Sequence, residues 1–451
     1  MGQVVTFQYG LSSDPYKITQ ITDPFGRTAV FNYTTDPSGA LELKSITDQL
    51  GLNSSYQYQT GDFISQLTTP YGTTTFTQVS NPLDSSTTSL LAVDPNGGQE
   101  YWENWIDKNP DVPDSEKLLP NGISTQQNQY LAFRNTYYWN TAAIAMDPGH
   151  PYTNAYVYHW LHSGNGSDET PVLESEKPAL ESRIWYTYHN QTNGPTYIGS
   201  SDEPFEVARV LDDGSTQLWR YVYNYLGHVT QRTDPIGRTT VYAYDTNNVD
   251  LLSVYQDNPS GTSTDPYQVP ADLIASFTYY PFHLVNTATD ASGQTTTYTY
   301  NNFSEIKTVT PPIRAGKGAE TTTYTYGQGP GNLGGYLKTI TGPQAGAITQ
   351  MSYDGRARIQ SITASDGAVT SFNYDSGDRV TGITFPDSSE EAFQYQNLNL
   401  HFSQDRSGYW TEYFHNSVRQ LVAVEDPMLG SPRINAAHAV TSKRSGTRRV
   451  T

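Results

Sequence analysis

The 451-residue chain carries 45 acidic against 26 basic side chains, and its formal net charge of −19 argues against nucleic acid as a partner, because phosphates require Lys and Arg. It contains no cysteine, which excludes disulfides and thiolate metal sites. Hydrophobic residues make up only 35%, but 35 Tyr and 15 Phe compensate, since a tyrosine ring packs on a sheet while its hydroxyl stays in water. We therefore predict an ordered, all-β protein.

Residues 1–97 begin within a strand and contain about four copies of a short repeat. Met1 is followed directly by an alternating segment from Val4 to Tyr9, which is the end of a repeat and not a signal peptide. Four turns follow at spacings of 25, 21 and 25 residues, at positions 23–26, 48–51, 69–72 and 94–97. We expect the chain to be a piece of a longer protein or the product of a broken gene, with any export signal upstream. No apolar run reaches the length of a membrane-spanning helix.

Residues 98–220 interrupt the repeats, and we interpret them as an insertion that packs on the repeat sheet. Apolar and aromatic residues recur at helical spacing from Tyr130 to Ile144, which predicts one helix over about 124–146. Aromatic-rich strands are predicted over 155–161 and 183–189, and in the first of these Tyr156, Tyr158 and Trp160 share one face. The insertion therefore has a mixed helix and strand composition.

Residues 221–430 return to the repeat, which is clearest over 353–395. There Tyr353 recurs as Tyr374 and Tyr395, a fixed period of 21 residues that is typical of repeat architectures. A single hairpin of this size is marginally stable, so each unit must stack on the next. Residues 431–451 form a basic segment without strand pattern, which we predict to be a disordered or frameshifted tail.

Each unit of this segment is predicted to be a β-hairpin. Asp366-Gly367 supplies the positive φ angles of a tight turn, and Phe372 and Tyr374 alternate onto one face of the returning strand. Ile359 and Ile362 on the outgoing strand are three residues apart and cannot share a face of a regular strand. Either a bulge intervenes or both faces of this strand carry apolar groups.

The turns and tyrosines follow a recognisable pattern, Tyr-Asp-x-x-Gly-Arg with Asp-Pro-x-Gly-Arg-Thr and Tyr-x-Tyr-Asp. The best match is the segment DPIGRTTVYAYD from Asp234 to Asp245, and Asp23 to Tyr33 is nearly as good. This pattern resembles the RHS or YD repeat family of bacterial polymorphic toxins, wall-associated proteins, the C component of insecticidal toxin complexes, and teneurins. The motif residues predicted to be structural are Asp23, Gly26, Arg27, Tyr33, Asp234, Gly237, Arg238, Tyr244, Asp245, Tyr353, Asp354, Arg358, Asp366, Gly367, Tyr374, Asp375, Arg379 and Tyr395.

The resemblance implies that the hairpins form one antiparallel sheet that spirals into a hollow shell. In the toxin members of the family the shell encloses a C-terminal effector and carries an aspartic autoprotease near a D-P-x-G-L motif. Here Asp426-Pro427-Met428-Leu429-Gly430 has an extra residue and no following Leu. The carboxylic residues of this region are Asp405, Glu412, Glu425 and Asp426. We interpret Asp426 as a repeat-turn residue and predict that the chain does not cleave itself.

Two sequence matches to ligand-binding loops are interpreted as ordinary loops. Residues 329–334 fit G-x-G-x-x-G, but a strand is predicted next where a nucleotide site needs a helix. Asp107, Asn109 and Asp111 match the start of a calcium loop, whose later Gly and Glu positions are Val112 and Leu118 here.

Two further clusters have a functional and a structural interpretation. His159 and His162, with His150 nearby, could indicate a metal, but residues three apart on a strand face opposite ways, so structural histidines are favoured. Glu100 and Glu103 could be an acid pair on an aromatic sugar platform, for which a turn after a repeat is the favoured alternative. The aromatic residues of that platform are Tyr101, Trp102 and Trp105.

The sequence therefore favours a non-enzymatic scaffold segment of an RHS-type surface or secreted protein that encapsulates or displays a toxin or effector. The alternatives are a carbohydrate-binding cell-surface module, because aromatic β faces suit sugar stacking, and an enzyme within residues 98–220. We expect no cofactor and no metal. The expected partners are the rest of a longer RHS protein or its C-terminal effector, and glycans, and the expected location is extracellular or at the cell surface.

Overall fold

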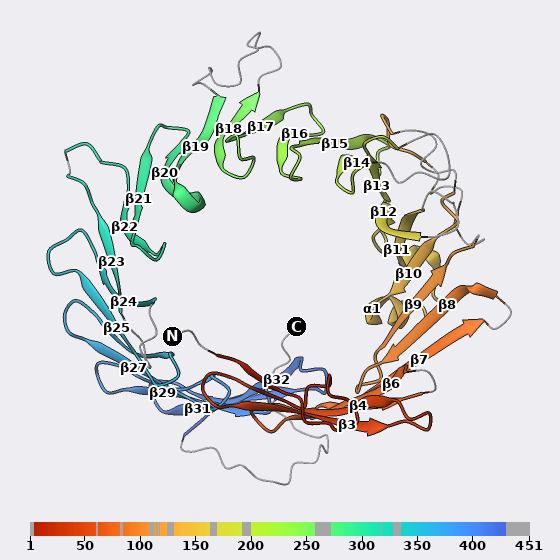
Figure 1. Ribbon diagram of the computed structural model, residues 1–451, viewed down its shortest axis with the longest axis horizontal. Coiled ribbons are helices and arrows are strands. Elements are labelled where there is room, and N and C mark those ends of the chain that lie inside the picture. Colours follow the sequence, from red (N-terminus) through yellow and green to blue (C-terminus); the bar gives the residue numbers. More distant parts are fainter. Residues whose placement is uncertain are drawn as a thin grey trace. The chain divides into compact units, whose positions relative to one another are not determined.

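The computed structural model describes residues 4–59, 62–81, 84–107, 112–113, 116, 118–123, 130–162, 169–191, 200–257, 272–316, 318–327 and 335–429. Within these residues it confirms the all-β fold of repeated antiparallel hairpins. The 32 strands are assigned to one antiparallel sheet, and α1 (Thr141–Met146) is the one α-helix of the described part (Figure 1). Asp-Gly and Asx turns separate short strands rich in Thr and Tyr, the composition that favours a pleated, half-buried surface.

The strands follow one another in chain order and most are five to eight residues long. The first nine are β1 (Thr6–Gln8), β2 (Gln20–Thr22), β3 (Thr28–Thr35), β4 (Leu41–Thr47), β5 (Asn53–Tyr58), β6 (Ile64–Thr69), β7 (Gly72–Asn81), β8 (Asp84–Val93) and β9 (Gln99–Trp105). The next group is β10 (Asn135–Trp139), β11 (Tyr156–His162), β12 (Glu169–Lys177), β13 (Ile184–Tyr188), β14 (Pro204–Val210), β15 (Thr216–Tyr223), β16 (Val229–Thr233), β17 (Thr239–Tyr244), β18 (Leu251–Asp257), β19 (Leu273–Tyr280), β20 (Leu284–Asp290) and β21 (Thr295–Tyr300). The last are β22 (Ile306–Thr310), β23 (Thr322–Gly327), β24 (Tyr336–Thr341), β25 (Ile348–Tyr353), β26 (Ile359–Thr363), β27 (Val369–Tyr374), β28 (Val380–Thr384), β29 (Glu390–Gln396), β30 (Asn399–Gln404), β31 (Tyr409–His415) and β32 (Leu421–Leu429). The described residues also include the 3-10 turns η3 (Tyr152–Asn154) and η5 (Pro281–His283).

The chain divides into two compact units, each described here by itself. Unit 1 comprises Met1–Phe76, Val93–Gly98 and Tyr300–Thr451, and unit 2 comprises Thr77–Ala92 and Gln99–Thr299. Among the described residues no helix is both long and apolar enough to cross a membrane.

A β-bulge resolves the placement of Ile359 and Ile362. Tyr353 on β25 pairs with Ile359, but Met351, two residues earlier on the same face, pairs with Ile362, so β26 has one extra residue. The bulge brings both isoleucines to the face of Tyr353. The same register shift accompanies other tyrosines near a strand end, namely Tyr33, Tyr58, Tyr223, Tyr244, Tyr326, Tyr374 and Tyr395.

The helix predicted over 124–146 is wrong for most of the described residues in that range. Residues 124–129 lie outside the described part, residues 135–139 form β10, and only Thr141–Met146 is helical, capped by the Asn140 side chain on the N–H of Ala143 at 2.9 Å. Along β10 every second residue is buried, a period of two that outweighs the apparent helical spacing.

The described strands of residues 98–220 belong to a sheet in their own chain order. From β9 to β15 each strand pairs edge to edge with the next. The predicted strands over 155–161 and 183–189 are confirmed as β11 and β13. Tyr156, Tyr158 and Trp160 share one face and stack at 4.6 and 5.9 Å between ring centroids.

Most of the fully buried apolar side chains in the described residues lie in unit 2. On β10, β11 and β13 they include Tyr137, Val157 and Trp185, on the face opposite to Tyr156, Tyr158 and Trp160. A cluster built on Tyr137, Trp139 and Val157 packs against α1, and Trp185 on β13 is 1% exposed. In unit 1 the described apolar residues that reach full burial are Phe402 and Trp410. The repeat strands of unit 1 are thus mostly half-exposed. Contacts between turns must therefore contribute much of the interaction between neighbouring hairpins.

Candidate functional site

Each Tyr-Asp turn is held closed by its own aspartate. In the turn after β25, Asp354 Oδ1 accepts the backbone N–H groups of Arg356 and Arg358 at 2.8 and 3.0 Å, and Arg358 Nε donates to Asp354 Oδ2 at 2.8 Å. Burial by itself would raise the pKa of Asp354, but these hydrogen bonds and the guanidinium charge lower it below its usual value. The carboxylate therefore stays charged and satisfies two backbone donors of the turn.

The arginine of one turn also binds the following turn. Arg358 Nη1 donates to the backbone carbonyl of Asp375 and to Asp378 Oδ1, both at 2.9 Å, and its guanidinium lies 4.5 Å from the ring centre of Tyr374. Arg379 makes the corresponding contacts one repeat later, with a carbonyl of the next turn and a tyrosine ring at 4.3 Å. Consecutive hairpins are thus joined by side chains as well as by strand pairing.

The repeat tyrosine completes this link. Tyr374 donates its hydroxyl to the carbonyl of Ile359, beside the bulge, at 2.8 Å. A bulge interrupts the ladder of backbone hydrogen bonds, so a side-chain donor there replaces a ladder partner. The same bond to a neighbouring strand is made by Tyr58, Tyr223, Tyr279, Tyr326, Tyr353 and Tyr395. Tyr33 donates in the same way to the carbonyl of Ile18, two residues before β2.

The other motif residues chosen from the sequence occupy equivalent turns. Asp23 with Arg27, Asp234 with Arg238 and Asp375 with Arg379 form the same aspartate–arginine pair, at 2.5, 2.6 and 2.8 Å. Positive φ angles of 81°, 86° and 85° are found at Gly26, Gly237 and Gly367. Asp366 accepts the N–H of Ala368, Tyr244 stacks on His228, and Asp245 closes a longer turn with Asp250.

Removing the hydroxyl of one repeat tyrosine tests this link. We expect Tyr374→Phe to lower the free energy of unfolding by about 0.5–1.5 kcal/mol, because the bulge carbonyl of Ile359 loses its donor. Urea denaturation measures the loss. Tyr409→Phe is the matched control, since the Tyr409 side chain is 38% exposed. Equal losses in the two variants would contradict a specific role for the Tyr374 hydroxyl.

Within unit 1, turns of the early repeats contact turns of the late repeats. The Arg27 guanidinium binds the Asp378 carboxylate and donates to the carbonyl of Ser376 at 3.3 Å. Leu50 lies against Gly377, where an added Cβ would come within 2.9 Å of a Leu50 methyl group. The turn from Asp375 to Arg379 therefore meets two early turns at once, and the contacting residues are 351 positions apart in the Arg27–Asp378 pair.

A double-mutant cycle measures this long-range contact. We expect Arg27→Gln and Asp378→Asn to show a coupling of about 0.5–2 kcal/mol in the free energy of unfolding, because the Arg27 side chain is only 17% exposed. The Arg406–Asp387 pair is the control, since its side chains are 48% and 60% exposed and such pairs contribute little. A coupling no larger than that of the control would contradict the docking contact.

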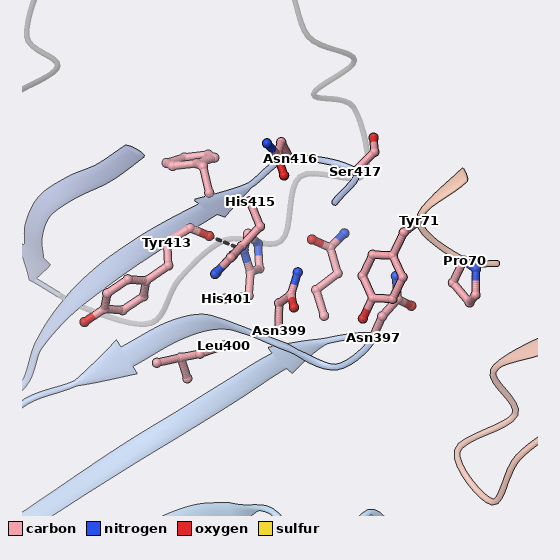
Figure 2. Close-up of a pocket in the computed structure, with 12 residues that line it drawn as sticks. Pro70, Tyr71, Asn397, Asn399, Leu400, His401, Tyr413, His415, Asn416 and Ser417 are labelled. Atoms are coloured by element: carbon pink, nitrogen blue, oxygen red, sulfur yellow. Dashed lines mark hydrogen bonds between the residues drawn. The ribbon is translucent and has the colours of Figure 1, made fainter. Parts of the chain in front are cut away.

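A polar pocket lies beside a third contact between early and late turns (Figure 2). Tyr71 accepts the N–H of Leu398 on its hydroxyl at 2.7 Å, and Arg419 lies over its ring while donating to Asn399 at 2.9 Å. The pocket has a volume of about 250 Å³. Its lining residues are Pro70, Tyr71, Gln396, Asn397, Asn399, Leu400, His401, Tyr413, Phe414, His415, Asn416 and Ser417.

The lining suits binding of a neutral polar molecule. It offers amides, imidazoles and hydroxyls but no carboxylate and no lysine. His401 Nδ1 lies 3.4 Å from the Tyr413 carbonyl and its Nε2 lies 3.6 Å from Glu412 Oε1, so its ring is oriented by the strand next to it. Nothing in the sequence pointed to this pocket, because Tyr71 and Leu398 are 327 residues apart.

Unit 2 contains a buried polar cluster around His159, one of the histidines singled out from the sequence. His159 is 0% exposed, with Nδ1 3.1 Å from Asn135 Oδ1 and Nε2 3.1 Å from Glu174 Oε2, the latter at an angle poor for a hydrogen bond. Arg134 and Arg183 also act electrostatically on the ring. Burial lowers the pKa of His159, an effect that Glu174 opposes and the two arginines reinforce.

Two basic side chains of this cluster, Lys177 and Arg183, have hydrogen-bond partners within the protein. The Lys177 ammonium, on a side chain 4% exposed, donates to the carbonyls of Thr153 and Pro178 at 3.1 and 3.3 Å, and burial lowers its pKa. Arg183 binds Ser175 at 2.9 Å and Tyr152 at 2.8 Å, and burial raises the pKa of Tyr152 to about 12. Among the described residues no group of three His, Asp or Glu side chains could hold a metal ion.

The burial of His159 predicts a loss of stability in acid. The unfolded chain takes up a proton near the ordinary pKa of 6.5, while the folded chain does so only at lower pH, so unfolding is favoured as pH falls through 6.5. We expect a slope of up to about 1.4 kcal/mol per pH unit from this one group. Thermal unfolding of the wild type and His159→Gln between pH 5 and 8 measures it, with exposed His189→Gln as control. An unchanged slope in His159→Gln would exclude this origin.

The structure places the glutamate pair singled out from the sequence, whereas several of the other candidate residues lie outside its described part. Glu100 and Glu103 lie on strand β9 and not in a turn, and they point to opposite faces, with Glu103 opposite Tyr137 on the buried side. The side chain of His162 lies outside the described residues, as do Asn109, Asp111 and residues 329–334.

Asp426 is not a turn residue as expected, because its backbone belongs to β32. Two of the other carboxylic residues of this region, Glu412 and Glu425, face each other across β31 and β32. Asp405 closes the turn before β31, where its Oδ1 accepts the N–H of Tyr409 at 3.0 Å.

No family model and no curated protein matches the sequence. Solved structures do resemble the fold. One is a mutated Tc holotoxin pore of Photorhabdus luminescens, with a TM-score of 0.51 and 12% identity over 92% of this chain and 21% of that chain. Another is TcdB2-TccC3 without its hypervariable C-terminal region, with a TM-score of 0.48 and 12% identity over 96% of this chain and 21% of that chain. The likeness to the first shows a shared fold and agrees with the RHS repeat resemblance of the turn motifs.

Proposed function

We propose that this chain is a non-enzymatic scaffold segment of an RHS-type repeat protein and forms part of a shell that encloses or displays an effector polypeptide. The observation that carries the proposal is the recurrent turn, in which Asp354 and Arg358 hold one hairpin and Arg358 also binds the next. Side chains of the repeat motif thus link consecutive hairpins to one another. A wall built from hairpins requires such links, because each hairpin is stabilised by its neighbours.

The burial of the repeat strands favours a thin wall rather than a solid core. Most described residues on the strands of unit 1 are half-exposed, and the described apolar residues of this unit that reach full burial are Phe402 and Trp410. Both faces of the repeat strands are therefore available, one for the effector and one for the surroundings. Partners in this proposal are the rest of a longer RHS protein and its C-terminal effector, and the location is extracellular or at the cell surface. The chain spans 21% of the toxin chains it resembles, so these roles concern the longer protein.

Small-angle X-ray scattering of the purified chain tests the shell. A compact protein of 451 residues has a radius of gyration of about 22 Å, and we expect a clearly larger value with a distance distribution skewed to long distances. A Kratky plot that returns to baseline shows that the chain is folded and that the size does not come from unfolding. A folded particle with a radius close to 22 Å and a symmetric distribution would contradict the proposal.

A non-enzymatic scaffold is also expected to remain intact. Asp426 lies on β32, and the motif around it departs from D-P-x-G-L. Intact-mass spectrometry after days at pH 5 and pH 7 should give one unchanged mass. A specific cut between Asp426 and Leu429 that Asp426→Asn abolishes would show an autoprotease instead.

A carbohydrate-binding module is the second candidate, favoured by the pocket beside Tyr71. Its neutral amides, imidazoles and hydroxyls suit a polyhydroxylated ligand. Screening the chain on a glycan array tests it, with Asn399→Ala and Tyr71→Ala as lining variants. Binding of a defined glycan that both variants lose would support this function, and the absence of any specific signal would leave the scaffold as the function.

A further inference from the structure

The turn from Asp234 to Arg238 has the same sequence pattern and the same internal bonds as the turn from Asp23 to Arg27. Both segments read Asp-Pro-x-Gly-Arg-Thr. In both, the aspartate Oδ1 accepts the N–H groups two and four residues later, at 2.9 Å each in the first turn and at 3.1 and 2.9 Å in the second. The two turns thus have the same local structure, and any difference in exposure comes from what lies against them.

Their outer surfaces differ sharply. The Arg27 side chain is 17% exposed because its guanidinium binds Asp378 and Ser376, whereas the Arg238 side chain is 69% exposed. Among the described residues, the ion-pair partner of Arg238 is Asp234 of its own turn, bonded through Nε. Ile236 at the tip of this turn is 76% exposed, a position at which Phe25 of the first turn is half-buried.

We propose that the Asp234–Arg238 turn is a docking site for a Tyr-Asp turn carried on polypeptide outside these 451 residues. The contacts that the Asp23–Arg27 turn makes with the Asp375–Arg379 turn define the chemistry of the occupant. Asp378 supplies a carboxylate and Ser376 a backbone carbonyl to the guanidinium. Gly377 between them lies against Leu50 of the next early turn. The occupant is therefore an acidic turn of the form Asp-Ser-Gly-Asp or one close to it.

The spacing of the occupied contacts explains why the occupant comes from outside. In unit 1, contacting turns are separated by 327 to 351 residues. A turn that far beyond Asp234 falls past residue 451. The inference rests on the proposed repeat shell. It adds to that proposal the residues of one contact between distant repeats and the acidic charge of the turn that binds Arg238.

A peptide that reproduces the occupant tests the site on the full chain. The probe is a backbone-cyclised, fluorescein-labelled peptide with the sequence of Val369–Thr384, cyclised because a free hairpin of this length is marginally stable. Fluorescence anisotropy should show saturable binding below about 1 mM. Arg238→Gln in the protein and Asp378→Asn in the peptide should each weaken binding at least fivefold, and the two together no further than either change alone.

The matched control is Arg220→Gln, because Arg220 is 53% exposed in the same unit and pairs with Glu206 on the neighbouring strand. Its binding should equal that of the wild type. Absence of saturable binding by the wild type, unchanged binding by Arg238→Gln, or equal loss in Arg220→Gln would overturn the docking site. The scattering result is independent of Arg238, so a shell-like profile without peptide binding would refute this site and leave the scaffold in place.

Discussion

Replacing Gly72 with alanine is expected to destabilise unit 1 by about 2–5 kcal/mol, and this is one of the two largest effects the structure predicts. Gly72 opens β7 with a φ of +130°, a conformation that L side chains rarely adopt. A Cβ built there would also lie 2.7 Å from the Cβ of Pro95, in the turn that ends the next hairpin. Backbone strain and overpacking therefore act at one position.

Two further variants separate these causes. Gly97→Ala should cost only about 1–2 kcal/mol, because Gly97 has a φ of +85° but nothing within 4 Å of an added Cβ. In the Gly72→Ala background, Pro95→Gly should recover part of the loss by removing the clashing atoms. Urea denaturation of the three variants gives the free energies. Equal losses at Gly72 and Gly97 would show that the contact with Pro95 is unimportant.

Truncation of Trp185 to alanine is expected to have an effect of similar size in unit 2. Trp185 is 1% exposed, opposite Ser175 and Ala208 on the neighbouring strands, and removing so large a buried ring costs about 3–5 kcal/mol. The free energy of unfolding of Trp185→Ala measures the effect.

Trp102→Ala is the matched control on the other face of the same strands. Trp102 is half-buried and stacks on Tyr138 at 4.9 Å, so its loss should cost less than about 2 kcal/mol. If the two variants were equally destabilised, the buried face of β9 to β13 would not be the core of unit 2.

The local features of the repeats could be predicted from the sequence because their causes are local. Asp366-Gly367 forms a tight turn through the conformational freedom of glycine and a side-chain bond over two residues, and both are visible in the order of residues. The alternation of Phe372 and Tyr374 follows in the same way from the two-residue period of a strand. The all-β class and the turn positions therefore needed no knowledge of distant contacts.

The segment around β10 was mispredicted because two periodicities overlap there. Tyr130, Phe133 and Tyr137 have helical spacing, but Asn135, Tyr137 and Trp139 are the buried residues, and their period of two is concealed by a buried asparagine. Asn135 is buried because its amide donates to the Leu131 carbonyl at 2.8 Å and its oxygen faces His159. Pairing with β9 and β11 decided between the two patterns.

What the sequence alone determined is thus the hairpin period, the turns and the tyrosine face, while the tertiary structure decided the register and the contacts between turns that are far apart in the sequence. Ile359 and Ile362 share a face only because their partners on β25 are two residues apart, which is a property of the pair and not of either strand. Likewise, Arg27 and Arg238 stand in the same motif, yet one is covered and the other is exposed. Residues 351 positions apart leave no mark on local sequence, because their contact depends on how the intervening repeats bring the chain back.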